Sequence, residues 1–281
     1  MYEIPFFPVP RAHARVTDIL QDPIFLRVRE VGDLPLPILK PWEENPHNSM
    51  DFVDALRSNA IAVFTCQHFP ERIYISQNWL RIPNEEKVVV LLHELAHADD
   101  YFTGAIALRG EYVIQAPAPE RIFATTQAGY CKLEEATCAL LSTPCEVRAE
   151  VRVIQIFPGA GTEYVAGELR RRLKCMRQGL QLHNSGTRGD SQYTLLHTTD
   201  SIVFYRAIAR AVVGIVPEFA NECTFGANEI AQFRKDVCGK LMSPEIVAIL
   251  SLMEMEDDLA RYYHTYSNLL QHLFGSRLVR R

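Results

Sequence analysis

Two histidines and a glutamate in one short segment could together bind a metal ion and activate a water molecule. His93, Glu94 and His97 form the pattern His-Glu-x-x-His. On a helix, side chains four positions apart lie one turn apart on the same face, so the two imidazoles could bind one Zn²⁺. Glu94 would then be the general base for a water that attacks a peptide carbonyl. The alternative is a core helix whose histidines make ordinary hydrogen bonds.

The sequence around this pattern predicts the helix that such chemistry needs. Asn84 follows Pro83 and can cap a helix over residues 84–98, whose first turn contains two glutamates. Apart from His93 and Glu94, residues 88–96 are all apolar, which is typical of a helix that runs through a core. Gly104 is a stop signal beyond it.

A catalytic zinc site needs a third protein ligand, and Glu146 is the best candidate. A helix that begins near Pro144 would place Glu146 and Glu150 on one face. Glu150 is the second choice, as a ligand or as a hydrogen-bond partner of a histidine. Glu146 also has a structural alternative, because Thr143 and Glu146 have the spacing of a capping box with Pro144 at the first helical position.

Composition and charge exclude several classes of protein. The chain has 281 residues, which suits one large domain or a domain with appendages. Its formal charge is −5, and this acidity argues against a nucleic-acid partner. A solvated helix face explains the basic cluster at residues 170–174. No apolar run is long enough for a membrane span and no secretory signal is recognised, so a soluble or peripheral protein is expected.

The expected fold class is α+β and predominantly helical, in three regions. Eight of the 16 prolines fall in the first 46 residues, which predicts an irregular arm over residues 1–50. Residues 51–240 form the domain with the metal-binding pattern, and residues 241–281 form a helical extension. A strand is expected at residues 72–76, where it could line a cleft and pair with an extended substrate. Further helices are predicted over residues 51–64, 162–182, 199–220, 227–240 and from an N-cap at Ser243 to about Phe274.

Three segments in a fixed order resemble one family of zinc peptidases. They are Ile-Tyr-Ile-Ser-Gln-Asn at 73–78, His-Glu-Leu-Ala-His-Ala-Asp-Asp at 93–100 and Cys-Glu-Val-Arg-Ala at 145–149. With cysteine-containing segments near Cys175 and Cys223, they resemble the mitochondrial inner-membrane-associated metallopeptidases that process ATP synthase subunit 6. The resemblance spans about residues 60–235.

This resemblance implies a zincin-like fold with a small sheet beside the His-Glu-x-x-His helix. It makes His93, His97 and Glu146 the zinc ligands and Glu94 the catalytic base. Asp100 matches an aspartate of the family's helix and could orient a ligand imidazole. Because the family works in the intermembrane space, some disulfide pairing among the seven cysteines is expected, with buried, reduced cysteines as an even alternative.

The expected function is that of a zinc-dependent endopeptidase. The resemblance implies a polypeptide substrate, namely an extended segment of a membrane-protein precursor, and a place in the mitochondrial intermembrane space, peripheral to the inner membrane. It also implies a role in ATP synthase assembly, and the alternative location is cytoplasmic. A second hypothesis is an assembly factor or chaperone that binds a membrane subunit, although the retained Glu94 favours an active enzyme. A DNA-associated zinc peptidase would be expected to carry a basic surface, which the net acidity contradicts.

Overall fold

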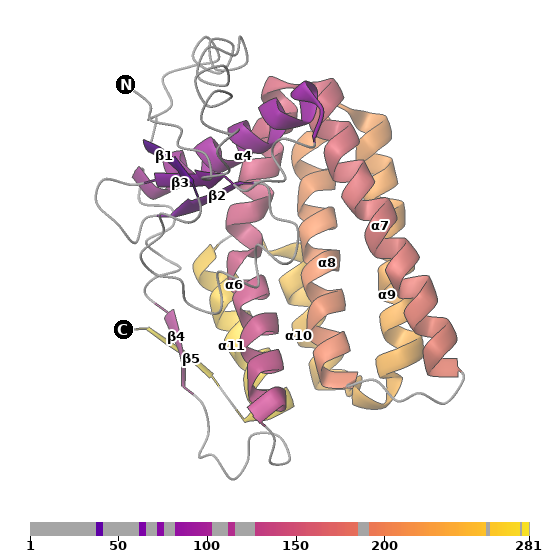
Figure 1. Ribbon diagram of the computed structural model, residues 1–281. Coiled ribbons are helices and arrows are strands. Elements are labelled where there is room, and N and C mark those ends of the chain that lie inside the picture. The colour runs from indigo at the N-terminus through magenta and orange to yellow at the C-terminus, as the bar shows by residue number, and fades with distance from the viewer. Residues whose placement is uncertain are drawn as a thin grey trace. The chain divides into compact units, whose positions relative to one another are not determined.

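Most of the residues that the computed structural model describes are helical (Figure 1). The described residues are 38–41, 62–65, 72–75, 82–102, 112–115, 127–184, 191–256, 259–275 and 277–280. They include seven α-helices: α4 (Asn84–Phe102), α6 (Gln127–Ile156), α7 (Pro158–Asn184), α8 (Ser191–Val212), α9 (Pro217–Cys238), α10 (Pro244–Met255) and α11 (Leu259–Phe274). The predominantly helical fold that the sequence predicts is therefore confirmed.

The chain divides into two compact units. The first comprises Met1–Ala105 and Arg152–Tyr164, and the second comprises Ile106–Val151 and Val165–Arg281. The domain boundaries expected near residues 50 and 240 stay predictions, and the arm over residues 1–50 lies outside the described residues except for one short strand. Among the described helices, none is both long enough and apolar enough to cross a membrane.

In the first unit, three short strands form a sheet in the order β1-β3-β2. Strand β3 (Arg72–Ile75) lies in the centre, parallel to β1 (Ile38–Pro41) and antiparallel to β2 (Ala62–Thr65). Its Ile73 is fully buried, opposite Leu39 and Phe64. Because both edges of β3 are already paired, the expectation that this strand receives an extended substrate is wrong.

Strand β2 also corrects the helix expected over residues 51–64. Residues 62–64 belong to β2, and the rest of that span lies outside the described residues. Val63 and Phe64 favour extended backbone, and both residues pair with β3. Strand β2 packs against α4 and is an edge of the described sheet.

Helix α4 spans Asn84–Phe102, four residues beyond the predicted end, and Asn84 is its first residue rather than the expected cap before it. The Lys87 N–H donates to the Pro83 carbonyl and closes the first turn at 3.0 Å. Every residue from Val88 to Leu92 is buried, so this part of the helix is held by packing on several sides. Gly104 lies outside the described residues.

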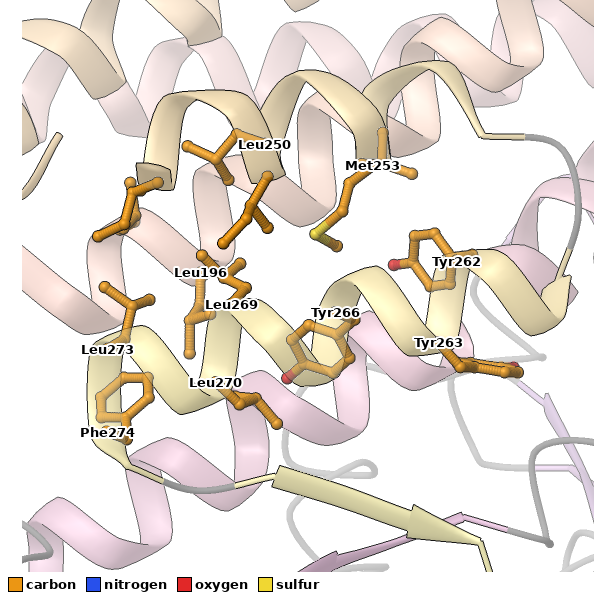
Figure 2. Close-up of a cluster of buried hydrophobic side chains, with 14 of the residues drawn as sticks. Leu196, Leu250, Met253, Tyr262, Tyr263, Tyr266, Leu269, Leu270, Leu273 and Phe274 are labelled. Atoms are coloured by element: carbon orange, nitrogen blue, oxygen red, sulfur yellow. The ribbon is translucent and has the colours of Figure 1, made fainter. Parts of the chain in front are cut away.

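In the second unit, α8 and α9 run side by side, and α10 packs on both α8 and α11 (Figure 1). Figure 2 shows Leu250 and Met253 pointing from α10 toward α11, where Tyr266 and Leu269 meet them. The aromatic side chains of α11 are core residues: Tyr262, Tyr263, Tyr266 and Phe274. Strands β4 (Tyr112–Gln115) and β5 (Arg277–Arg280) form a separate antiparallel pair.

Two predicted helices are broken in the structure. The helix expected over residues 199–220 ends with α8 at Val212, and α9 begins at Pro217, which suits a first helical position. The long helix expected from Ser243 to Phe274 begins correctly, because the Ser243 side chain accepts a hydrogen bond from the Ile246 N–H at 3.3 Å. It ends at Met255, where extended backbone at Glu256 separates α10 from α11.

Candidate metal centre

Helix α4 brings the two histidines of the His-Glu-x-x-His pattern together. The Nε2 atoms of His93 and His97 lie 3.0 Å apart, and the ring centroids lie 4.6 Å apart at an interplanar angle of 88°. Both imidazoles are half-buried, whereas Leu92, Leu95 and Ala96 between and beside them are buried. The helix therefore packs through its apolar residues and directs two ring nitrogens toward one point.

The distance between these nitrogens suits a shared metal ion. Two nitrogen ligands that each lie about 2.0–2.1 Å from a tetrahedral zinc are about 3.3 Å apart. The 3.0 Å between the Nε2 atoms is close to that value. The same distance also allows one neutral imidazole to donate a hydrogen bond to the other, which is the ordinary alternative for two helical histidines.

A third donor completes a group that could hold a metal ion. One ligand atom from each of His93, His97 and Glu146 lies within 4.8 Å of the others, and all three residues are half-buried. Two imidazole nitrogens and one carboxylate oxygen are a donor set found in catalytic zinc centres. The residues present therefore fit a zinc ion.

The structure contradicts the alternative in which Glu146 belongs to a capping box. Helix α6 runs without interruption from Gln127 to Ile156, with Pro144 inside it. Thr143 is 1% exposed, and its hydroxyl donates to the carboxylate of Asp200 on α8. The spacing of a capping box is present, but the Thr143 side chain binds Asp200 on another helix instead of capping a helix start. Helix α6 therefore continues through this position.

No protein-family model, curated protein or solved structure matches this chain. The likeness to a family of mitochondrial zinc peptidases therefore rests on the sequence motifs quoted above, and the chemistry has to be argued from the residues themselves.

The remaining predicted site residues are buried carboxylates. Glu94 is 8% exposed and follows His93 directly on α4. Asp100 is 4% exposed and lies three residues after His97, in a last turn that contains no basic residue. Glu150 is 6% exposed, one turn after Glu146 on α6. A buried carboxylate requires polar partners, and the roles of Asp100 and Glu150 beside ligand side chains stay predictions.

The described cysteines are reduced. Cys145, Cys223 and Cys238 are buried and Cys175 is exposed, and none of these four forms a disulfide. Burial raises the pKa of the Cys223 thiol to about 12 and that of Cys238 to about 11. These thiols therefore act as apolar core groups near neutral pH. Cys131, Cys138 and Cys145 all lie on helix α6, which continues through Pro144.

Asp200 and Arg172, neither of which the sequence assigns to the site, are joined by a hydrogen bond in the structure. Arg172 belongs to the basic cluster explained above as a solvated face, and Arg170, Arg171 and Lys174 are indeed exposed. Arg172 instead donates to the Asp200 carboxylate at 3.4 Å and to the Ser201 hydroxyl at 2.8 Å. Burial lowers the Arg172 pKa, but the nearby Tyr205 and Asp200 outweigh it and raise that pKa overall. Asp200 lies between Thr199 and Ser201 in a polar stretch of α8, so its own segment carries no signal that this carboxylate binds α6 and α7.

Proposed function

We propose that this protein is a zinc-dependent endopeptidase. The observation that carries the proposal is the convergence of the His93 and His97 Nε2 atoms, 3.0 Å apart on α4, with Glu94 between them in the chain. A structural pair of histidines needs no glutamate at this position, whereas a hydrolase needs a base beside its metal. The donor oxygen of Glu146 supports the same conclusion.

In this proposal the chain's residues divide into ligands and a base. His93, His97 and Glu146 would hold the zinc ion. When bound there, the ion supplies Lewis acidity that lowers the pKa of a bound water and polarises a peptide carbonyl. The Glu94 carboxylate accepts the proton of the attacking water and then passes it to the leaving amine nitrogen. One carboxylate thus serves as base and acid in turn, and the peptide bond is cleaved by addition of water.

The first unit offers an edge for an extended polypeptide. Strand β2 packs against α4 and pairs with β3 on one side only among the described strands. An extended peptide could add to the free side of β2 by backbone hydrogen bonds, with its direction fixed by the register of the sheet. This edge replaces β3 as the expected substrate strand. The motif resemblance favours a segment of a mitochondrial membrane-protein precursor as substrate, with the enzyme peripheral to the inner membrane and assisting ATP synthase assembly.

Metal content and cleavage test the proposal together. We expect purified protein to contain near one zinc per chain by mass spectrometry, and His97→Ala to lose it. His264→Ala, which removes an exposed histidine of α11, is the matched control and should retain zinc. Glu94→Gln should keep the metal and lose cleavage of denatured casein, because the base is removed but the ligands are not. A wild-type protein without zinc, or a Glu94→Gln variant with full activity, would refute the proposal.

A further inference from the structure

Pro144 destabilises α6 locally, in the turn that contains Glu146. Pro144 lies inside the helix and has no N–H, so the carbonyl of residue 140 loses its usual intrahelical partner. The proline ring also crowds the preceding turn, which favours a kink. Glu146 follows two residues later. The direction of its carboxylate therefore depends on contacts that hold this turn from outside the helix.

Such a contact exists one residue before the proline. The Thr143 hydroxyl donates to Asp200 Oδ1, and both side chains are buried, Asp200 at 8% exposed. Thr143 is also a hydrogen-bond partner of the buried Tyr262 on α11. Residues three apart on a helix are neighbours on its surface, so a restraint on Thr143 is transmitted directly to Glu146.

Asp200 is itself held in place. Arg172 Nη1 on α7 donates to Asp200 Oδ2 at 3.4 Å and to the neighbouring Ser201 hydroxyl at 2.8 Å. The two carboxylate oxygens of Asp200 thus have partners on two different helices, α6 and α7. A carboxylate fixed at both oxygens can orient Thr143 more sharply than one held at a single oxygen. The guanidinium also offsets the negative charge that α8 buries at this point.

We propose that Thr143 and Asp200, fixed by Arg172, are positioning residues that orient Glu146 as the third metal ligand. This inference rests on the proposed function, because it assigns a task to the site described above. The hydrogen bond compensates at Thr143 for the backbone bond that Pro144 removes one residue later. Groups that orient metal ligands typically contribute about 10–100-fold to metal affinity.

The central experiment measures zinc affinity by competition with a chelator. Thr143→Val removes the hydroxyl at nearly constant volume and should weaken zinc binding by about 10-fold or more. Thr143→Ser keeps the hydroxyl and should bind zinc as the wild type does. Thr198→Val is the matched control: Thr198 is buried on α8, and the bonds of its hydroxyl within the described residues go to the carbonyls of Thr194 and Leu195 in its own helix, at 2.7 and 3.0 Å. Zinc affinity should be unchanged in this control.

A second comparison separates positioning from a general structural effect. The visible d–d absorption of the Co²⁺-loaded protein reports coordination and should change in Thr143→Val but not in Thr198→Val. In a Glu146→Ala background, Thr143→Val should have no further effect on the affinity for Cu²⁺, which binds histidine sites more tightly than zinc does. If Thr143→Val does not fold, Arg172→Gln replaces it in both comparisons, because Arg172 is partly exposed.

The outcomes distinguish the two proposals. If folded Thr143→Val keeps wild-type zinc affinity and the wild-type Co²⁺ spectrum, the positioning role is wrong while the zinc site stands. Equal losses of metal affinity with and without Glu146 would also overturn the positioning role, since the effect would then not pass through that carboxylate. If the wild type binds no zinc, or if His97→Ala binds it equally well, the proposed function fails first.

Discussion

Arg234 and Glu254 form an ion pair of 2.7 Å in which each side chain is 7% exposed. The pair joins α9 to α10, and Arg206 of α8 binds the second carboxylate oxygen of Glu254. Arg210 of α8 donates to the Glu254 backbone carbonyl at 3.0 Å. Three helices of the second unit therefore converge on one carboxylate, and two guanidinium groups share its charge.

Glu254→Gln should destabilise the protein strongly. The amide keeps the size of the side chain, but the Arg234 cation would remain buried without an opposite charge. Breaking a buried pair in this way costs about 3–5 kcal/mol in the free energy of unfolding. Urea denaturation followed by circular dichroism measures the change. Glu229→Gln removes a carboxylate that binds Arg177 on the surface at 3.0 Å and should cost less than about 1 kcal/mol. Similar losses in both variants would contradict the buried network.

Two glycines in neighbouring helices should respond to alanine with opposite signs. A Cβ on Gly226 of α9 would lie 2.7 Å from Cδ1 of Leu169, a core side chain of α7, so Gly226→Ala should cost about 1–3 kcal/mol by overpacking. A Cβ on Gly167 of α7 would meet nothing within 4 Å. Gly167→Ala should stabilise the helix by up to about 1 kcal/mol. Thermal unfolding of the two variants checks both signs, and a stabilised Gly226→Ala would refute the tight α7–α9 packing.

Local sequence signals predicted the elements that depend on local chemistry. The metal-binding pattern lies on a helix because its neighbours are apolar nearly throughout, and α4 contains the whole predicted range 84–98. The Ser243 cap also formed as expected, because its hydroxyl needs only the backbone three residues later. These features require no knowledge of distant contacts.

Predictions failed where a distant partner decides the outcome. Thr143 and Pro144 have the signature of a helix start, but Asp200, 57 residues away, binds the threonine and the helix continues through the proline. Residues 62–64 continue a helical pattern, yet they pair with β3. Arg172 looks like a surface cation because nothing in its own segment points to Asp200. Spacing in the chain cannot supply such contacts.

Zinc should stabilise the folded protein in a way that depends on the site. A ligand that binds only the folded state at 100 times its dissociation constant adds about 2.7 kcal/mol to the free energy of unfolding. Thermal unfolding of wild-type protein should therefore shift upward with added zinc, and chelator should reverse the shift. His97→Ala should show no shift, whereas His272→Ala, which removes an exposed histidine of α11, should behave as wild type does. An equal shift in His97→Ala would place the stabilising metal elsewhere.

The buried Cys238 should make the protein less stable in mild alkali. Burial raises its pKa from 9.0 to about 11, partly offset by Arg234, and the thiol donates to the Ser191 carbonyl at 3.3 Å. Between these two pH values the unfolded chain has lost the thiol proton and the folded chain has kept it. The free energy of unfolding therefore falls as pH rises, by about 1 kcal/mol between pH 8 and pH 10 from this group.

Urea titrations at pH 8 and pH 10 measure this contribution. Cys238→Ala lowers stability at both pH values because it leaves a small cavity, so the relevant quantity is the difference between them. That difference should be smaller than in wild type by about 1 kcal/mol. Cys175→Ala removes an exposed thiol and should keep the wild-type pH dependence. If Cys238→Ala loses as much stability between pH 8 and pH 10 as the wild type does, the pKa of the Cys238 thiol is not raised in the folded protein.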